Sequence, residues 1–153
     1  MLKNKKGITL VSIIITIIVM IILAGIGIAT SDIIGRAYTQ KITSNMILIQ
    51  TKVKILMEKA SFNQDTSTYY LGRKLKDQPN KSQIAGQALS ASELEEDTLY
   101  VYDKETLESM GLEGIELYND QVYIINYANG EVIFPDGLKN SLGTIVYRLS
   151  DLI

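Results

Sequence analysis

The pattern of hydrophobic and polar positions changes near residue 31. Residues 7–31 contain no charged side chain, and most positions are Ile, Leu, Val, Met, Ala or Gly. As a helix this run would be roughly 37 Å long, which exceeds the ~30 Å of hydrocarbon in a bilayer. The pattern therefore predicts a membrane-spanning helix at residues 8–31.

Beyond this run, apolar side chains recur at every third or fourth position. They are Ile34, Tyr38, Ile42, Met46, Ile49, Val53, Leu56 and Ala60. This spacing places them on one face of a helix. The first proline is Pro79, so no proline interrupts the pattern. We predict that the helix continues through residues 32–60 as an amphipathic half that enters a globular domain.

Residues 61–98 have weak periodicity and many Ser, Asn, Gln and Gly positions, which is typical of a variable connecting segment. Within it, Tyr69, Tyr70 and Leu71 are expected to pack back on the long helix, and residues 81–88 are expected to form a short helix. The sequence SASE at 90–93 fits a capping box that opens a helical turn.

The last third of the chain predicts strands separated by turn signals. The expected strands cover residues 99–102, 121–127, 131–134 and 143–149, before a terminal turn at 150–153. Asp103 is expected to cap a helix at 104–110 that Gly111 closes. Asn129 and Gly130 form a hairpin signal, and Asn119-Asp120 and Asp136-Gly137 are turn signals. Together with the long helix, residues 99–153 predict an α+β fold, in which the helix packs on a small antiparallel sheet.

Charge is distributed unevenly around a net value of −2. Lys3, Lys5 and Lys6 stand before the apolar run, and without these three the net charge would be −5. Positive charge on this flank predicts a cytoplasmic N-terminus and a C-terminal domain outside the membrane. The acidic remainder gives no support for nucleic-acid binding, which requires a basic face.

The chain contains no cysteine and no histidine, which excludes disulfides, histidine acid–base chemistry and histidine metal ligands. The densest acidic cluster is ELEED at 93–97. It would suit either a cation or, as we favour, a solvated helix start where acids complement the dipole. The tyrosines that alternate on the expected strands suit packing of a half-buried sheet. We predict no enzyme activity, no cofactor and no metal site.

The residues before the apolar run resemble a known leader. Lys5, Lys6 and Gly7 stand directly before the sequence ITLV at 8–11. This order resembles the prepilin leader of type IV pilins and type II secretion pseudopilins. The resemblance implies a pilin-like fold in which prepilin peptidase removes residues 1–7 by cutting between Gly7 and Ile8, after which Ile8 is N-methylated. More weakly, the later strands resemble the C-terminal region of pilin-like proteins in Gram-positive bacteria.

The resemblance implies a structural role, as a minor pilin or pseudopilin of a type IV pilus or a type II secretion-like filament. The expected partners are other pilin subunits, reached through the N-terminal helix, together with prepilin peptidase and the assembly platform. The subunit would cross the plasma membrane once and later join a cell-surface filament. Two alternatives stay open. One is an ordinary secretory signal peptide, and the other is a signal-anchored extracellular binding protein that forms no filament.

Ser12 departs from the pattern of the family. Most members carry glutamate at this position, which is thought to pair with the N-terminal amine of a neighbouring subunit. Serine has no charge with which to neutralise an amine in apolar surroundings. One hypothesis places this subunit at the filament tip, where no earlier amine needs a partner. The other holds that serine is tolerated, with its hydroxyl bonded back to the helix.

Overall fold

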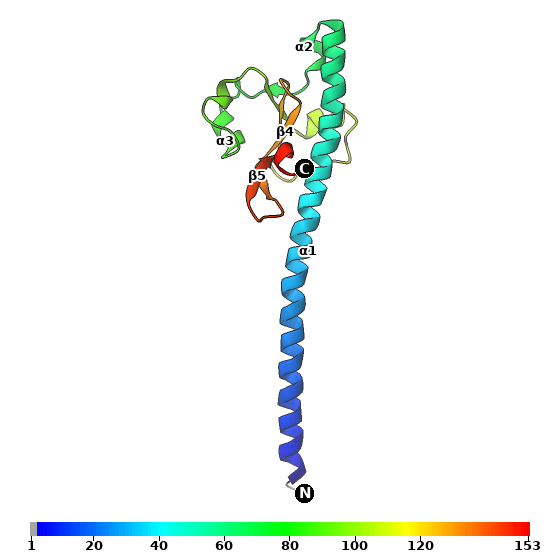
Figure 1. The fold of residues 1–153 in the computed structure, drawn as a ribbon, viewed down its shortest axis with the longest axis vertical. Helices are drawn as coiled ribbons and strands as arrows, with labels where there is room; N and C mark the ends of the chain where they lie inside the picture. Colours follow the sequence, from blue (N-terminus) through cyan, green and yellow to red (C-terminus); the bar gives the residue numbers. More distant parts are fainter. Residues whose placement is uncertain (1–2) are drawn as a thin grey trace. The chain divides into compact units, whose positions relative to one another are not determined.

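The computed structural model describes the backbone of residues 3–153, and the side chains of residues 9–24 and 33–153. The chain divides into two compact units, Met1–Tyr38 and Thr39–Ile153. Helix α1 (Lys3–Asn63) supplies residues to both units (Figure 1). The prediction of one helix without a break is therefore confirmed, and its last helical residue is Asn63 instead of the expected Ala60.

The first unit consists of the N-terminal part of α1. Its large apolar side chains between positions 10 and 23 are all exposed, and so are Ile33 and Ile34. Ile34 and Tyr38 were expected to be the first residues of the buried stripe, but they are 68% and 40% exposed. Among the described residues, no helical segment combines the length and the hydropathy that crossing a membrane requires.

In the second unit, α1 buries the middle of the predicted apolar stripe. Ile42, Met46, Ile49 and Val53 are at most 2% exposed, because their spacing of three or four residues keeps them on one helix face. Further along, Ala60 is also buried. The first four side chains form part of the larger of two apolar clusters, in which α1 packs on the sheet. The amphipathic half is thus confirmed from residue 42 onward.

The sheet has five antiparallel strands in the order β1-β2-β3-β4-β5. The strands are β1 (Arg73–Lys74), β2 (Leu99–Tyr102), β3 (Tyr123–Asn126), β4 (Glu131–Lys139) and β5 (Ile145–Arg148). Neighbours in the chain are neighbours in the sheet, so the topology is a simple meander. The α+β class is confirmed, although the two-residue β1 was not expected.

Both faces of the sheet are buried, and alternate residues of each strand face opposite sides. Along β2, Tyr100 and Tyr102 belong to the cluster on the α1 face, whereas Leu99 and Val101 belong to the second cluster. Ile124 of β3 and Ile133 of β4 join this second cluster. The sheet therefore forms a middle layer.

The second face is covered by the segment that sequence patterns indicated only as a connection. Leu75, Ala85, Ala88 and Leu94 are buried against it. They come from the region of α3 (Lys81–Ala85) and the 3-10 turn η1 (Glu93–Glu95), and Figure 1 shows α3 on the side of the sheet away from α1. This covering segment explains why β2 and β3 carry consecutive apolar residues.

The predicted helix caps are present. The Asp103 carboxylate accepts a 2.9 Å hydrogen bond from the Thr106 backbone N–H at the start of α4 (Lys104–Ser109). The Glu93 carboxylate accepts a 2.7 Å bond from the Ser90 backbone N–H, and the Glu93 N–H donates to the Ser90 hydroxyl at 3.4 Å. This reciprocal pair is the expected capping box.

Strand β4 differs from its prediction because Asp136-Gly137 does not end it. The chain continues to Lys139 through a bulge, where the register with β5 shifts between Ile133 and Leu138. Gly137 permits the bulge because its φ is +76°. The remaining helical elements are α2 (Thr66–Tyr69) and the C-terminal turn η2 (Leu149–Asp151).

Candidate functional site

The residues of the expected leader lie at the start of α1. The backbone at positions 5–8 is helical, while the side chains of Lys5, Lys6 and Ile8 lie outside the described residues. Gly7 continues the same helical backbone. Cleavage after Gly7 and methylation of Ile8 therefore stay predictions.

The first candidate surface is the apolar part of α1 in the first unit. Its large side chains are between 47% and 66% exposed on every side of the helix. They are Leu10, Val11, Ile13, Ile14, Ile15, Ile17, Ile18, Val19, Met20, Ile21, Ile22 and Leu23. A helix that is apolar all round is one that other apolar material covers. We call residues 10–23 the apolar segment.

Ser12 lies within the apolar segment and is exposed. Its carbonyl accepts a hydrogen bond of 2.8 Å from the Thr16 hydroxyl, one helical turn later. This bond satisfies the Thr16 hydroxyl within the apolar segment, so that hydroxyl needs no partner from another helix. The Ser12 side chain itself carries no charge.

The second candidate surface is the face of α1 that points away from the sheet in the second unit. Leu48, Ile55 and Phe62 are 52%, 43% and 89% exposed. Together with Ser44 and Thr51, which are also exposed, they follow a spacing of three, four or seven residues. We call this set the outer stripe. The sequence carries a signal for this stripe, because Leu48, Ile55 and Phe62 recur at intervals of seven residues, but only the buried face of the helix was predicted.

The acidic cluster at 93–97 is engaged with cations of the same unit. Glu93 pairs with Arg148, Glu95 with Lys81, and Asp97 with Lys76. Most of these pairs lie at the surface, where each contributes little to stability. In the described part of the chain, no three His, Cys, Asp or Glu side chains are grouped as a metal site would need.

Glu93 differs from the other acids of the cluster at 93–97, because its carboxylate accepts a capping-box hydrogen bond and its side chain is partly buried. The backbone N–H of Ser90 lowers the pKa of the Glu93 carboxyl most, and the Ser90 hydroxyl and Arg148 lower it further. Partial burial acts in the opposite direction but does not prevail. The carboxylate therefore joins the capping box to β5 through Arg148.

We expect Glu93 to make stability depend on pH. Because its folded pKa lies below the ordinary 4.5, its contribution is present above that value and is lost as pH falls through the folded pKa. Glu93→Gln should cost about 1–2 kcal/mol at pH 7, and progressively less as pH falls below 4.5. Urea unfolding of the full chain in detergent, followed by tyrosine circular dichroism, measures this. Glu96→Gln is the control, and equal losses in the two variants at pH 7 would contradict the assignment.

A cluster of tyrosines lies at the end of the sheet nearest Leu71. Tyr70 stacks on Tyr127 with ring centroids 4.0 Å apart, and the Tyr102 and Tyr127 hydroxyls are hydrogen-bonded to each other. Burial raises the pKa of Tyr127 to about 12, so its hydroxyl keeps its proton at neutral pH. Tyr123, on the same face, packs on Phe134. The tyrosines thus act in packing, as their alternation on the strands predicted.

Comparisons of the chain with protein families, with curated proteins and with solved structures found no match.

Proposed function

We propose that this chain is a pilin-like structural subunit, a minor pilin or pseudopilin, that assembles into a filament through α1. The observation that carries the proposal is the order of features along one helix. Lys5, Lys6 and Gly7 stand directly before an uncharged apolar run, and the same helix then packs on an antiparallel sheet. In this proposal the chain acts as a building block and not as an enzyme.

The exposure of the apolar segment supports assembly. So many exposed apolar side chains would be unfavourable in water, since each fully buried Leu or Ile gains about 1.5–3 kcal/mol. In a membrane, lipid would cover them before assembly. In a filament, helices of other subunits would replace the lipid, and close packing would then provide the gain.

The outer stripe supports a second helix contact in the same assembly. It lies opposite the buried face that holds Ile49 and Val53, so it is available while the sheet is in place. Thr51 is compatible with close packing because its hydroxyl already donates to the Ile47 carbonyl at 2.8 Å. Neighbouring subunits would therefore contact α1 at the apolar segment and at the outer stripe.

Within this proposal, the lack of charge at Ser12 favours a position of this subunit at the filament tip. A buried amine is costly unless a charge pairs with it. A subunit that initiates the filament would have no earlier amine to neutralise, so an uncharged residue would suffice there. A repeating shaft subunit would meet this cost at every addition.

Immunogold imaging of surface filaments, with an antibody against the second unit, tests the proposal. We expect label at one end of each filament. Label along the whole shaft would contradict the tip position, and filaments without label would contradict the subunit role in favour of a signal-anchored binding protein. Ser12→Glu should give fewer filaments of unchanged length, because the added charge disturbs initiation, whereas the control Ser12→Thr should leave filament number unchanged.

A further inference from the structure

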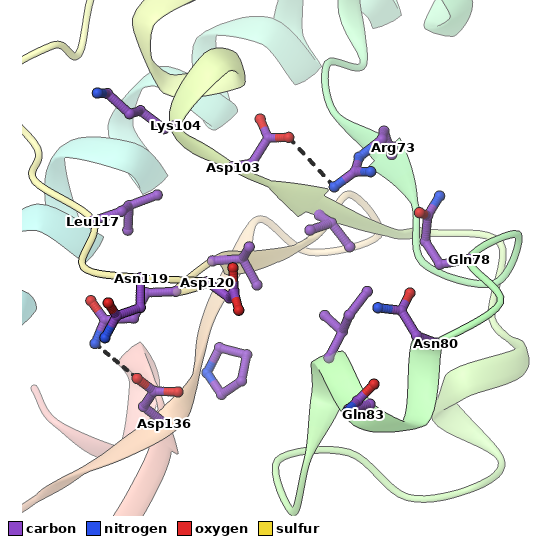
Figure 2. Close-up of a pocket in the computed structure, with 15 residues that line it drawn as sticks. Arg73, Gln78, Asn80, Gln83, Asp103, Lys104, Leu117, Asn119, Asp120 and Asp136 are labelled. Carbon is purple, nitrogen blue, oxygen red and sulfur yellow. Dashed lines mark hydrogen bonds and ion pairs between the residues drawn. The ribbon is translucent and has the colours of Figure 1, made fainter.

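A polar groove of about 660 Å³ opens on the second unit, between two walls that come from distant parts of the chain. One wall is the segment from β1 to α3, and it carries Asn80 and Gln83 (Figure 2). The opposite wall carries Asn119 and Asp120, which precede β3, and Asp136 from the β4 bulge. The volume is in the range of small-molecule sites.

Five amide side chains line this groove, which we call the amide groove. They are Gln78, Asn80, Gln83, Asn119 and Gln121. Gln121 donates to Asp136 at 2.8 Å, and Gln78 donates to the Lys74 carbonyl at 3.3 Å. In the described part of the chain, the other three amides form no side-chain hydrogen bond. Asn80 occupies the N-cap position of α3 without capping it, so its donors and acceptor stay available.

The charges of the amide groove nearly cancel. Its lining includes two cations, Arg73 and Lys104, and three carboxylates. Arg73 is already paired with Asp103 at 3.4 Å (Figure 2). Partial burial would raise the pKa of Asp103, but hydrogen bonds from Thr106 and the charge of Arg73 outweigh it and lower the pKa. The groove therefore offers no excess of positive charge for a phosphate or another polyanion.

The floor of the amide groove is a small apolar patch. It is formed by Ile84, Val101, Val122 and Pro135, which are buried or half-buried. A saccharide matches this combination, because its ring has an apolar C–H face and its hydroxyls both donate and accept. Each amide side chain likewise carries two donors and an acceptor. A peptide would use either an open strand edge or deeper side-chain pockets, and this groove lies over the face of the sheet.

We propose that the amide groove binds a neutral oligosaccharide. The ring would lie on the floor at Ile84 and Val122, which are half-buried, above the fully buried Val101. Its hydroxyls would bond to Gln83 from one wall and to Asn119 from the other. Asn119 is held at φ +53°, a conformation that asparagine tolerates and that fixes its direction on the wall. Oligosaccharide binding in the amide groove does not require that the chain assembles into a filament.

Methyl NMR of the full-length chain, in a detergent without a sugar head group, tests the proposal. The probes are cellotetraose, maltotetraose and chitotetraose, with blocked tetra-alanine as the peptide comparison. At least one tetrasaccharide should shift the methyl signals of Ile84, Val101 and Val122 in a saturable way. The double variant Gln83→Ala with Asn119→Gly should weaken binding about tenfold, since it removes two side-chain hydrogen bonds.

Gln40→Ala, which removes an exposed amide far along the sequence on α1, should leave binding unchanged. An unchanged tyrosine circular dichroism spectrum shows that the double variant is folded. Absence of a shift with all three tetrasaccharides overturns the proposal. So does binding that the double variant does not weaken, or a shift of the floor methyls with the peptide alone.

Discussion

Gly72→Ala is expected to lower the free energy of unfolding by about 3 kcal/mol, from about 1–2 kcal/mol for a left-handed backbone and a similar amount for overpacking. Gly72 has φ +89°, and a Cβ atom there would lie 2.6 Å from the Val101 carbonyl oxygen and 2.9 Å from the Tyr102 ring. Neither neighbour can retreat easily, because Val101 pairs with Arg73 in the sheet and Tyr102 is fully buried. Urea unfolding followed by tyrosine circular dichroism measures the loss.

Gly143→Ala provides a matched control for this prediction. Its φ of +79° is similar, but no atom lies within 4 Å of the position that a Cβ would occupy. This variant should therefore lose only about 1 kcal/mol, from the backbone alone. Equal losses in the two variants would contradict the close approach of Gly72 to β2.

Tyr127→Phe is expected to lower the free energy of unfolding by about 2 kcal/mol, because it leaves buried polar groups without partners. The Tyr127 hydroxyl accepts a 3.0 Å bond from the Leu71 N–H and donates to the Leu71 carbonyl at 3.2 Å. It is also bonded to the Tyr102 hydroxyl. Stacking on Tyr70 would survive the substitution, so the loss reports on the hydrogen bonds. The same urea unfolding experiment measures it.

A double-mutant cycle separates the Tyr102 bond from the other two. Tyr102→Phe with Tyr127→Phe should cost less than the sum of the single variants, since removing both partners leaves neither hydroxyl buried alone. Tyr118→Phe is the control, because Tyr118 is exposed and its hydroxyl donates to Glu116 at the surface, so the loss should stay within about 0.5 kcal/mol. Additive losses from the two single variants would contradict the Tyr102–Tyr127 bond.

Elements that depend on neighbouring residues could be predicted from the sequence. The limits of β2 agree with the prediction, and Asp103 and the Ser90–Glu93 box cap the turns that they were expected to cap. In each case the partners are at most a few residues apart, so the pattern contains the interaction. The buried stripe from Ile42 to Val53 was predictable for the same reason, since one helix supplies its spacing.

Elements that depend on distant partners could not be predicted in this way. Strand β1 has two charged residues and exists because it pairs with β2, which follows much later in the chain. Asp136-Gly137 has the chemistry of a turn, but pairing with β5 on both sides makes it a bulge. The amide groove joins separate segments of the chain, and no spacing within any one of them indicates it. Only the consecutive apolar residues of β2 and β3 signalled that the sheet has two covered faces.

In the proposed function, residues 1–7 are a leader and the rest of the chain is a filament subunit. Mass spectrometry of the protein purified from the cells that produce it distinguishes this function from an uncleaved anchor and from a secretory signal peptide. We expect a chain that begins at Ile8 with one added methyl group, and a Gly7→Leu variant that keeps residues 1–7. A wild-type chain that retains Met1, or one that begins after Ala29, would contradict it.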